Sequence, residues 1–569
     1  MTRTSLIAAA TTAAALAAFP AVASAVPTAA VNAANKTITV TGDDTAEAIT
    51  IAEAGGLITL NGSNDLGGAT APADGSFTLT VNAAGGDDTV TITAAGLSSA
   101  VLNGGAGNDT LQGGPGNDRI IGDTGSDTML GGNGNDVTVW NPGDGSDVMD
   151  GEGGADDAEL NGGGNAENFS ATPNAGRTRF ERLSPGPFNL DVAPTTERLV
   201  LNANGGNDTM VSDPAVTTAM LLNGGTGADA LTAGGGADNI GGGDENDSLD
   251  GGPGIDRIVG DRGGDAMRGV AGDDTLVWNN GDGSDTMDGQ DGLDRIEVNG
   301  AAGAGDAFVI APNSARAKFD RTNLGPFTLD IGTAEVLDVR GQGGDDTFAA
   351  QPGTPLAVLA DGGAGNDALT GAEEPDTFFG GAGNDALNGG AGPDLLDGQE
   401  GDDAILARDS AGDAVRGGIG TDSAQADLVD AIDGIESLDV PPAADVPPAA
   451  DVTATAVKVV SRRADVRNRR ARLTLECPAV EAGGCKGSIA VLSRQAFRVK
   501  GNRVRIVLAT ARFDIDAGAR ERVTLRLSKN AKRLSKQRRL PVVVQTVSRD
   551  AAGNLAQDSK RVTLRFPRR

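Results

Sequence analysis

A nine-residue phrase recurs in phase along much of the chain. The stretch "NGGAGNDTLQGGPGNDRI", residues 103–120, contains two copies of it. Written as G-G-x-G-x-D-x-U-x, where U is a large apolar residue, the phrase fills three arrays, at 104–159, 224–297 and 362–425. A short period sustained in this way predicts a solenoid of stacked coils, with two phrases making one 18-residue coil.

The sixth place of each phrase is an Asp, and these residues are the predicted metal ligands. They are Asp109, Asp118, Asp127, Asp136, Asp147 and Asp156 in the first array; Asp229, Asp238, Asp247, Asp256, Asp265, Asp274, Asp285 and Asp294 in the second; and Asp367, Asp385, Asp394, Asp403 and Asp422 in the third. Asp376 and Asp413 hold the same place, but Glu374 and Ala411 replace the fourth-place Gly of their phrases, so both are left out of the predicted set.

The eighth place argues against a disordered Gly-rich tether. It is Val, Ile, Leu, Met or Phe in 18 of 21 phrases, the exceptions being Thr138, Ala158 and Ala424. A tether has no reason to keep this phase. We therefore expect the last three residues of each phrase to form a short strand with its apolar side chain inward. The Gly residues should form a tight turn, with the Asp carboxylate pointing to the outside of that turn.

Composition excludes several chemistries. The chain has no His, which removes Ser-His-Asp triads, Cys-His pairs and His-ligated zinc. Charge is divided sharply along the sequence. Residues 452–569 carry 29 Lys and Arg against 8 Asp and Glu, whereas residues 1–451 carry 17 against 71. The chain is thus an acidic body with a basic end.

Residues 1–25 read as a secretory signal peptide, with Arg3, an Ala-rich apolar stretch and Ala23-Ser24-Ala25 at the cleavage site. We therefore expect a secreted or extracellular protein, with attachment to the cell surface as one possibility. No later segment is long and apolar enough to be a transmembrane span. The two cysteines, Cys477 and Cys485, predict a disulfide in an exported protein.

The predicted fold is all-β: a parallel β-roll or β-solenoid with strand-rich spacers, followed by a small β-sandwich. Period-two alternation, as in "KTITVTG" and "EVLDVRG", predicts strands in the spacers. Their "GGDDT"-like phrases place Asp88, Asp208 and Asp346 at a degenerate sixth place, which favours continuation of the solenoid through the spacers. We expect the insertions at Trp140-Asn141 and Trp278-Asn279 to bulge out or to break the stack. The expected segments after the signal peptide are the spacers 26–103, 160–223 and 298–361, the arrays 104–159 and 224–297, the third array with its closing segment 362–440, a Pro-rich linker 441–451 and a basic domain 452–569.

Two apolar side chains per coil cannot offset the ordering of 18 residues and the repulsion between stacked carboxylates. A cation must bridge them, and a ligand set of carboxylate and carbonyl oxygens favours Ca²⁺ over Mg²⁺. At this point the phrases "GGAGNDTLQGGPGNDRI" and "GGTGADALTAGGGADNI" resemble the RTX, or haemolysin-type, calcium-binding repeat family. The resemblance implies a β-roll with each ion between two stacked turns, held by sixth-place Asp side chains and turn carbonyls, with about a dozen ions in all. Exporter-dependent members of that family lack a cleaved N-terminal signal, which this chain has.

These features predict a non-enzymatic, structural or adhesive calcium-binding protein that folds on Ca²⁺ binding. The alternative is an extracellular polysaccharide-acting enzyme built on the β-helix, because Asp pairs capable of glycoside cleavage are plentiful. The C-terminal part loosely resembles bacterial immunoglobulin-like domains. Its basic charge fits an anionic cell-wall polymer or polysaccharide as partner, equally fits a merely solvated surface, and disfavours nucleic acid because aromatic residues are not interleaved.

Overall fold

The computed structural model describes residues 27–440 and most of 457–566, the latter as 457–467, 470–477, 485–493, 497–499, 502–504, 507–516, 519–527, 539–549 and 555–566. The predicted signal peptide and Pro-rich linker lie outside the described residues. Every regular element in these segments is a strand, so none of them is a helix that could cross a membrane. Two compact units are distinguished: the first runs to Gly389 and includes Gly398–Asp403, and the second comprises Gly390–Asp397 and the residues from Ala404 onwards.

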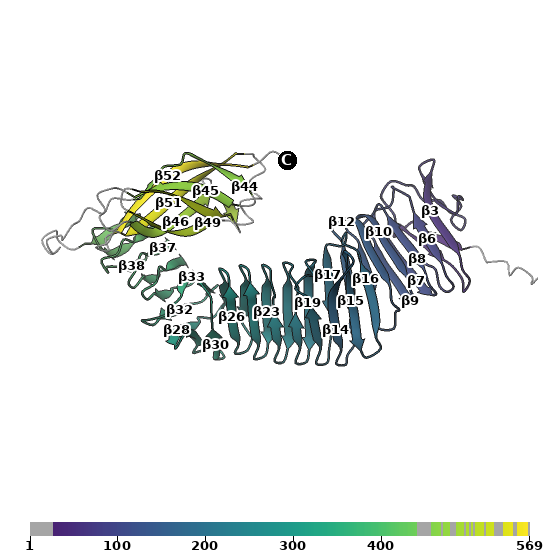
Figure 1. The fold of residues 1–569 in the computed structure, drawn as a ribbon, viewed down its shortest axis with the longest axis horizontal. Coiled ribbons are helices and arrows are strands. Elements are labelled where there is room, and N and C mark those ends of the chain that lie inside the picture. The colour runs from purple at the N-terminus through teal and green to yellow at the C-terminus, as the bar shows by residue number, and fades with distance from the viewer. Residues whose placement is uncertain are drawn as a thin grey trace, which may run out of the picture. The chain divides into compact units, whose positions relative to one another are not determined.

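In the first unit the chain winds alternately through two sheets, which we call sheet A and sheet B (Figure 1). After the antiparallel pair β1–β2, neighbouring strands of sheet A run parallel. The strands of sheet A are β1(Thr28–Asn32), β2(Thr37–Thr41), β5(Thr78–Asn82), β7(Ala100–Ala106), β9(Arg119–Thr124), β11(Val137–Trp140), β13(Asp157–Asn161), β17(Arg198–Asn202), β19(Ala219–Thr226), β21(Asn239–Asp244), β23(Arg257–Arg262), β25(Thr275–Asn279), β27(Arg295–Asn299), β31(Val336–Arg340), β33(Ala357–Ala364) and β35(Thr377–Ala382).

Sheet B is also mainly parallel, but each spacer adds antiparallel strands to it. Its strands are β3(Ala48–Ala54), β4(Leu57–Leu60), β6(Thr89–Ile92), β8(Thr110–Gly114), β10(Thr128–Gly134), β12(Val148–Gly154), β14(Asn168–Asn174), β15(Arg177–Ser184), β16(Phe188–Val192), β18(Thr209–Ser212), β20(Ala230–Thr232), β22(Ser248–Asp250), β24(Ala266–Ala271), β26(Thr286–Asp291), β28(Ala307–Asn313), β29(Arg316–Arg321), β30(Phe327–Ile331), β32(Thr347–Ala350), β34(Ala368–Thr370) and β36(Ala386–Asn388).

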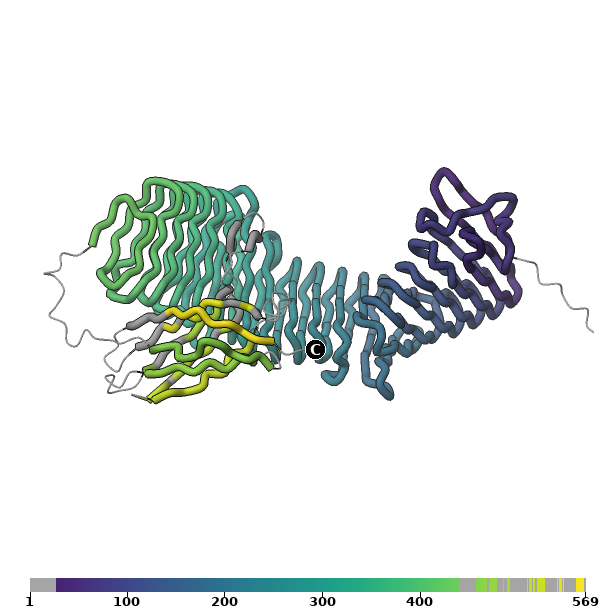
Figure 2. The backbone as a smooth tube through the Cα atoms, turned by 90° about the horizontal axis from the view of Figure 1, so that it is seen from above, coloured from purple at the N-terminus to yellow at the C-terminus, as the bar shows by residue number. Residues whose placement is uncertain are grey.

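The predicted coil of 18 residues is present, and its repeat is visible as the successive rungs in Figure 2. In sheet A, Leu222 pairs with Ile240 and Ile240 with Ile258, each one coil apart. In sheet B, Leu231 pairs with Leu249 in the same way. These eighth-place side chains are at most 2% exposed. The core is therefore two facing columns of aliphatic side chains, as the period-nine pattern predicts.

The spacers continue the solenoid. In the second spacer, β17 pairs in parallel with β13 on one side and β19 on the other. In sheet B, β16 pairs in parallel with β12, β15 lies antiparallel between β16 and β14, and β14 pairs in parallel with β18. The third spacer repeats this arrangement with β28, β29 and β30. The preference for continuation over interruption is thus confirmed in these strands.

The Trp-Asn insertions bulge at a corner and do not break the stack. Trp140 is the last residue of β11 and Trp278 is the penultimate residue of β25, both in sheet A, and both side chains are fully buried, at 0% exposure. After Trp140 the chain makes a turn from Asn141 to Asp144. The backbone N–H of Asp144 donates to the carbonyl oxygen of Asn141 at 3.0 Å. The coil then resumes two residues late, in register with its neighbours.

The second unit contains further short coil strands and a separate sheet. The coil strands pair in parallel, with Ile405 opposite Ala424 and Val415 opposite Ile432. They are β38(Ala404–Ala407), β39(Ala414–Ile419), β40(Ser423–Ala426), β41(Ala431–Asp433) and β42(Ser437–Asp439), while β37(Leu395–Glu400) contains residues of both units.

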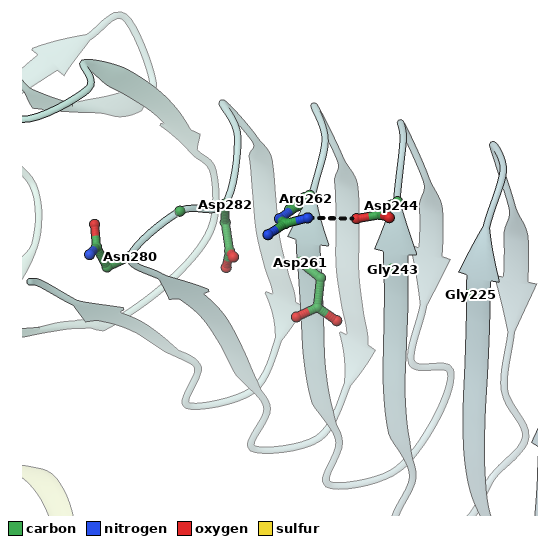
Figure 3. Close-up of a pocket in the computed structure, with 8 residues that line it drawn as sticks. Gly225, Gly243, Asp244, Asp261, Arg262, Asn280 and Asp282 are labelled. Carbon is green, nitrogen blue, oxygen red and sulfur yellow. Dashed lines mark ion pairs between the residues drawn. The ribbon is translucent and has the colours of Figure 1, made fainter.

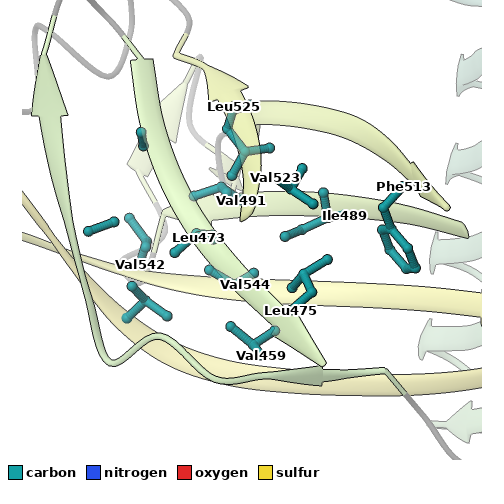
Figure 4. Close-up of a cluster of buried hydrophobic side chains, with 14 of the residues drawn as sticks. Val459, Leu473, Leu475, Ile489, Val491, Phe513, Val523, Leu525, Val542 and Val544 are labelled. Carbon is teal, nitrogen blue, oxygen red and sulfur yellow. The ribbon is translucent and has the colours of Figure 1, made fainter. Parts of the chain in front are cut away.

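The basic C-terminal residues form one curled eight-stranded sheet around a hydrophobic core that includes Leu473, Ile489 and Val544 (Figure 4). The predicted two-sheet sandwich and the immunoglobulin-like resemblance are not confirmed. The pairing β44–β52 is parallel, whereas β46 pairs antiparallel with both β49 and β51. The strands of this region, including the separate pair β47–β48, are β43(Lys458–Val459), β44(Arg463–Arg467), β45(Arg470–Glu476), β46(Cys485–Ser493), β47(Phe497–Val499), β48(Asn502–Val504), β49(Val507–Ile515), β50(Arg520–Arg526), β51(Arg539–Arg549) and β52(Leu555–Arg565).

The predicted disulfide between Cys477 and Cys485 is present, with an S–S distance of 2.06 Å. It joins the end of β45 to the start of β46, and both cysteines are buried in the core of this sheet.

The second-place Gly allows adjacent turns to stack closely. Gly243 has a φ of +114°, and a Cβ added there would overlap the carbonyl oxygen of Gly225 one coil earlier. We therefore expect Gly243→Ala to destabilise the folded protein by roughly 2 kcal/mol or more, from left-handed backbone strain and steric overlap. Thermal unfolding checks this, with Gly164→Ala as the control because a Cβ at Gly164 meets no atom within 4 Å. Equal unfolding midpoints for the two variants would contradict the expected stacking.

Candidate functional site

The sixth-place Asp residues form hydrogen-bonded columns along the solenoid. The backbone N–H of Asp238 donates to Oδ1 of Asp256 at 2.8 Å, and the N–H of Asp256 donates to Oδ1 of Asp274 at 2.8 Å. Each coil has two turns, one leading from sheet A to sheet B and the other from sheet B to sheet A. The acids therefore form two columns, which we call the A-to-B column and the B-to-A column.

The columns collect most of the predicted residues. The A-to-B ladders connect Asp109, Asp127 and Asp147 in the first array, Asp229, Asp247, Asp265 and Asp285 in the second, and Asp367, Asp385 and Asp403 in the third. The B-to-A ladders connect Asp118, Asp136 and Asp156 in the first array and Asp238, Asp256, Asp274 and Asp294 in the second. In the third array Asp394 donates to Asp413, and Asp422 donates to Glu436.

The predicted outward orientation of these carboxylates is wrong. The sixth-place Asp residues are between 0% and 4% exposed. The reason is the ladder itself: Oδ1 accepts an N–H from the preceding coil, so the side chain lies along the stack and is covered by the neighbouring turns. A carboxylate held in this way is expensive to bury unless its charge is neutralised.

The second carboxylate oxygen faces other acceptors. Oδ2 of Asp256 has no hydrogen-bond donor among the described residues, and the same holds for Oδ2 of Asp118. A Cβ added at Gly251 would lie 2.7 Å from Oδ2 of Asp256 and 3.0 Å from the carbonyl oxygen of Gly269 in the next coil. Two oxygen atoms from stacked turns thus converge on one small space. Because both are acceptors, they repel each other unless a cation or a hydrogen-bond donor lies between them.

This donor set fits a hard cation. Among the described residues no three Asp, Glu, Cys or His side chains gather at one point, so an ion here would be held by the column carboxylates together with backbone carbonyl oxygens of the turn. Oxygen ligands in an irregular arrangement suit Ca²⁺, whereas Mg²⁺ requires near-octahedral geometry and retains water. The cation would supply the positive charge that the buried Oδ2 atoms lack.

The column carboxyl groups have strongly raised pKa values. Burial raises the pKa of Asp256 to about 8, and the neighbouring carboxylates of Asp238 and Asp274 add to the rise. Burial likewise raises the pKa of Asp127 to about 7 and that of Asp247 to about 7. In each case the accepted backbone hydrogen bond acts in the opposite direction. Removal of the counter-charge therefore favours protonation of the columns near neutral pH.

Sequence reasoning placed three spacer residues correctly and missed others. Each of the three joins the A-to-B ladder by accepting a backbone N–H at Oδ1, at 2.6–2.7 Å. The donors are Glu47 for Asp88, Glu167 for Asp208 and Asp306 for Asp346. The acids Glu47, Glu167 and Asp306, and also Glu197 and Glu335, escaped notice because the column steps across the spacers are 40 or 41 residues, not 18. These acids could have been identified in the sequence as isolated Asp or Glu residues directly before a segment in which apolar and polar residues alternate.

Asp376 and Asp413, which were left out of the predicted set, still occupy ladder positions. Oδ1 of Asp376 accepts the N–H of Val358 at 2.8 Å and Oδ2 accepts the N–H of Ala372 at 3.2 Å. Asp413 accepts from Asp394 and donates to Asp430 at 3.0 Å. Loss of the fourth-place Gly therefore leaves the ladder in place, while Asp376 differs from Asp256 in having donors at both oxygens.

A second ladder runs beside the first at the rim of the turns. The fifth-place N–H of Ser126 donates to Oδ1 of Asn108 in the preceding coil at 2.9 Å, and Asn135 donates to Asn117 in the same way at 2.9 Å. The Asp ladder donates toward the following coil, whereas the Asn ladder donates toward the preceding coil. Each turn is therefore fixed by side chains of both neighbours.

An open groove of about 420 Å³ lies along the A-to-B turns of the second array (Figure 3). It is lined by the second-place residues of three successive coils, Gly225, Gly243 and Asp261, together with Asp244, Arg262 and residues 280–282. Arg262 pairs with Asp244 at 3.6 Å across neighbouring coils. The groove exists because the second place is mostly Gly, so side chains are missing along this line of the surface.

The fold and the turns define a repeat β-solenoid with columns of buried oxygen ligands. The model of the RTX calcium-binding nonapeptide repeat (4 copies) matches residues 103–137, 221–249, 241–276, 361–396 and 379–411. These matches fall in all three arrays, so the chain contains RTX calcium-binding nonapeptide repeats, as the sequence resemblance implies. A search of curated proteins finds no match to this chain.

The raised pKa values predict how the metal-free protein responds to pH. The folded pKa values of Asp256, about 8, and Asp127, about 7, exceed the value of about 4 in an unfolded chain, so the folded state binds more protons between these limits. The stability of the calcium-stripped protein should therefore be greatest below about pH 4 for these groups and decline as pH rises toward 8. Far-UV circular dichroism of calcium-stripped protein should show more β-structure at pH 5 than at pH 8. A spectrum that loses β-structure on acidification over this range would contradict the prediction.

Proposed function

We propose that the protein is a secreted, non-enzymatic calcium-binding solenoid with a structural or adhesive role at the cell surface or in the extracellular matrix. The observation that carries the proposal is the pairing of an acceptor-only Asp Oδ2 with a carbonyl oxygen of the adjacent coil, repeated along the columns. The proposed ligands are the nineteen predicted sixth-place Asp residues, and the ions are Ca²⁺.

Calcium binding and folding are one process in this proposal. The acidic part of the chain, residues 1–451, carries 17 Lys and Arg against 71 Asp and Glu. Without a metal ion the columns bring ionised carboxylates into a buried stack, which opposes coil formation. With Ca²⁺ bound, the same oxygens join each turn to the next, so the free energy of binding contributes directly to folding.

The columns also explain the proposed absence of catalysis. The predicted Asp residues are fixed by backbone hydrogen bonds inside the turn stack, where they serve as structural ligands. Incubation with a panel of acidic and neutral polysaccharides should therefore release no reducing ends, and release would favour the polysaccharide-acting alternative.

Asp256→Asn tests the role of the columns. Asn retains the Oδ1 acceptor for the ladder, removes the charge, and places an NH₂ donor where Oδ2 faces the Gly269 carbonyl. We expect the variant to bind at least one Ca²⁺ fewer per chain than the wild type, which should bind about a dozen. Metal analysis of dialysed protein measures the count.

The matched control is Asp320→Asn, because Asp320 lies on β29 of sheet B, where it pairs with Lys318 at 2.9 Å and accepts the hydroxyl of Thr328 at 2.7 Å, away from the column turns. It should bind as many ions as the wild type. In the two variants and in the wild type, chelation of calcium should remove most of the β-structure seen by far-UV circular dichroism. An unchanged wild-type spectrum, or a wild type without bound calcium, would overturn the proposed function.

The C-terminal sheet presents a row of arginines that fits an anionic polymer. Arg467 lies opposite Arg470, and Arg470 lies opposite Arg526, so three exposed guanidinium groups cross three neighbouring strands. Like charges directly opposite one another destabilise a sheet. By contrast, Arg520 lies opposite Glu476 and pairs with it at 3.0 Å. We propose that the row binds an anionic cell-wall polymer or polysaccharide.

The triple variant Arg467→Gln, Arg470→Gln and Arg526→Gln tests this surface. Using polyphosphate and polygalacturonate as probes, affinity at low salt should fall roughly tenfold or more, and the salt dependence of binding should weaken. Arg198→Gln, a change on the solenoid surface, is the control and should bind like the wild type. Equal binding by the triple variant would assign the basic end to a solvated surface only.

A further inference from the structure

Two spacer acids in the A-to-B columns differ from the array acids in having a protein cation. Glu167 and Asp306 occupy ladder positions, since their N–H groups donate to Asp208 and Asp346. Arg182 donates to Oε1 of Glu167 at 2.7 Å, and Arg321 donates to Oδ1 of Asp306 at 3.2 Å. The side chains of both pairs are at most 10% exposed.

The remaining oxygens of these two acids are also satisfied. Oε2 of Glu167 accepts the N–H of Gly163 at 2.6 Å, and Oδ2 of Asp306 accepts the N–H of Ala301 at 2.7 Å. The array residue Asp256, by contrast, presents Oδ2 to another acceptor. Glu167 and Asp306 therefore each have a counter-charge and a hydrogen bond at the second carboxylate oxygen, both of which Asp256 lacks.

Each arginine is held in place by its spacer. Arg182 lies on β15, and its Nε and Nη2 donate to the carbonyl oxygen of Gly186 at 3.1 and 2.9 Å. Its guanidinium lies 4.9 Å from the ring centroid of Trp140 and 5.2 Å from that of Phe188, and these two rings stack at 3.7 Å. A desolvated cation over two aromatic faces is strongly favoured, and a buried ion pair with its hydrogen bonds complete avoids an unpaired charge.

The third spacer contains an equivalent cluster of an arginine, an acid, a tryptophan and a phenylalanine. Arg321 lies on β29, donates to the Gly325 carbonyl at 3.0 and 3.3 Å, and stands 5.2 Å from the centroids of both Trp278 and Phe327. These rings also stack at 3.7 Å, and Arg321 donates further to Asn280 at 2.7 Å. The first spacer provides the contrast: Oε1 and Oε2 of its acid, Glu47, have no hydrogen-bond donor among the described residues.

We infer that Arg182 and Arg321 are fixed cations that replace calcium at the spacer positions from which the A-to-B ladders lead into the second and third arrays. We call each Arg-acid pair with its Trp and Phe a clamp. Resting on the proposed calcium binding of the arrays, the inference is that the clamps stay folded without metal and divide the solenoid into separately calcium-dependent arrays. Glu47, which has no arginine, belongs to the calcium-dependent part.

The two tryptophans make the inference measurable, because they are the only Trp residues in the chain and each lies in a clamp. Far-UV circular dichroism reports mainly on the arrays, whereas Trp emission and acrylamide quenching report on the clamps. On chelator titration of the full-length protein, the β-signal should fall while Trp emission stays blue-shifted and protected. If the Trp emission shifts to the red at the same chelator concentration as the loss of β-signal, the clamp inference is overturned and the calcium proposal stands.

Variants separate charge from packing. In chelator, Arg182→Met should expose Trp140, giving a red-shifted component and a several-fold larger quenching constant. The double variant Arg182→Met, Glu167→Gln should restore much of the protection, because no charge is then buried alone. The control is Arg179→Met, since Arg179 pairs with Glu181 on the surface of the same strand at 2.7 Å. Wild-type protection in Arg182→Met would overturn the role of the arginine.

Failure of the proposed function has a different signature. If the β-structure seen by far-UV circular dichroism does not change on addition of chelator, calcium-dependent folding is overturned. The division of the solenoid into calcium-dependent arrays and metal-independent clamps is then overturned as well. A responding β-signal with responding tryptophans would overturn the clamps alone.

Discussion

The hydrogen bond from a sixth-place Asp N–H to a carboxylate oxygen of the next coil, in most cases Asp Oδ1, is the interaction on which the rest of the solenoid depends. It fixes the rise from coil to coil, aligns the apolar columns of the two sheets, and turns each carboxylate into the stack. The same bond leaves the second carboxylate oxygen against a backbone carbonyl, so the geometry that orders the turns also creates an excess of buried negative charge. The hydrogen-bond pattern thus favours a cation at the turns, in addition to the acidic amino-acid composition.

Two kinds of counter-charge follow from the proposed function. In the arrays the proposed counter-charge of the column acids is an external ion, and coil formation then depends on calcium supply. In two spacers an additional strand carries an arginine to the column, and aromatic rings exclude water from it. A guanidinium is always charged and cannot dissociate from the chain, whereas a calcium ion can be removed by a chelator. In this proposal the arrays carry exchangeable counter-charges, whereas the second and third spacers carry permanent ones.

Much of the architecture was predictable from local sequence pattern. The eighth-place aliphatics, such as Ile240 and Leu249, identified the coil and its inward face, and the sixth-place Asp identified the columns. The direction of the carboxylates was not predictable, because it depends on a backbone donor 18 residues away. Glu167 and Asp306 were missed because the chain makes a three-stranded excursion between column positions. In the C-terminal region, alternation identified strands but not their partners: β44 pairs with β52, about a hundred residues later, and such pairings decide between a sandwich and a single curled sheet.

The oppositely directed Asp and Asn ladders have a consequence for how such a chain can lengthen over evolutionary time. A duplicated segment of one whole coil would meet matching hydrogen-bond donors and acceptors in the coils on either side. A segment of another length forms an insertion instead, either a bulge at a corner, as beside the tryptophans, or additional antiparallel strands in sheet B, as in the spacers. Insertion of complete coils therefore changes the structure of the neighbouring coils very little. The number of coils can change while the hydrogen bonds within and between coils stay the same.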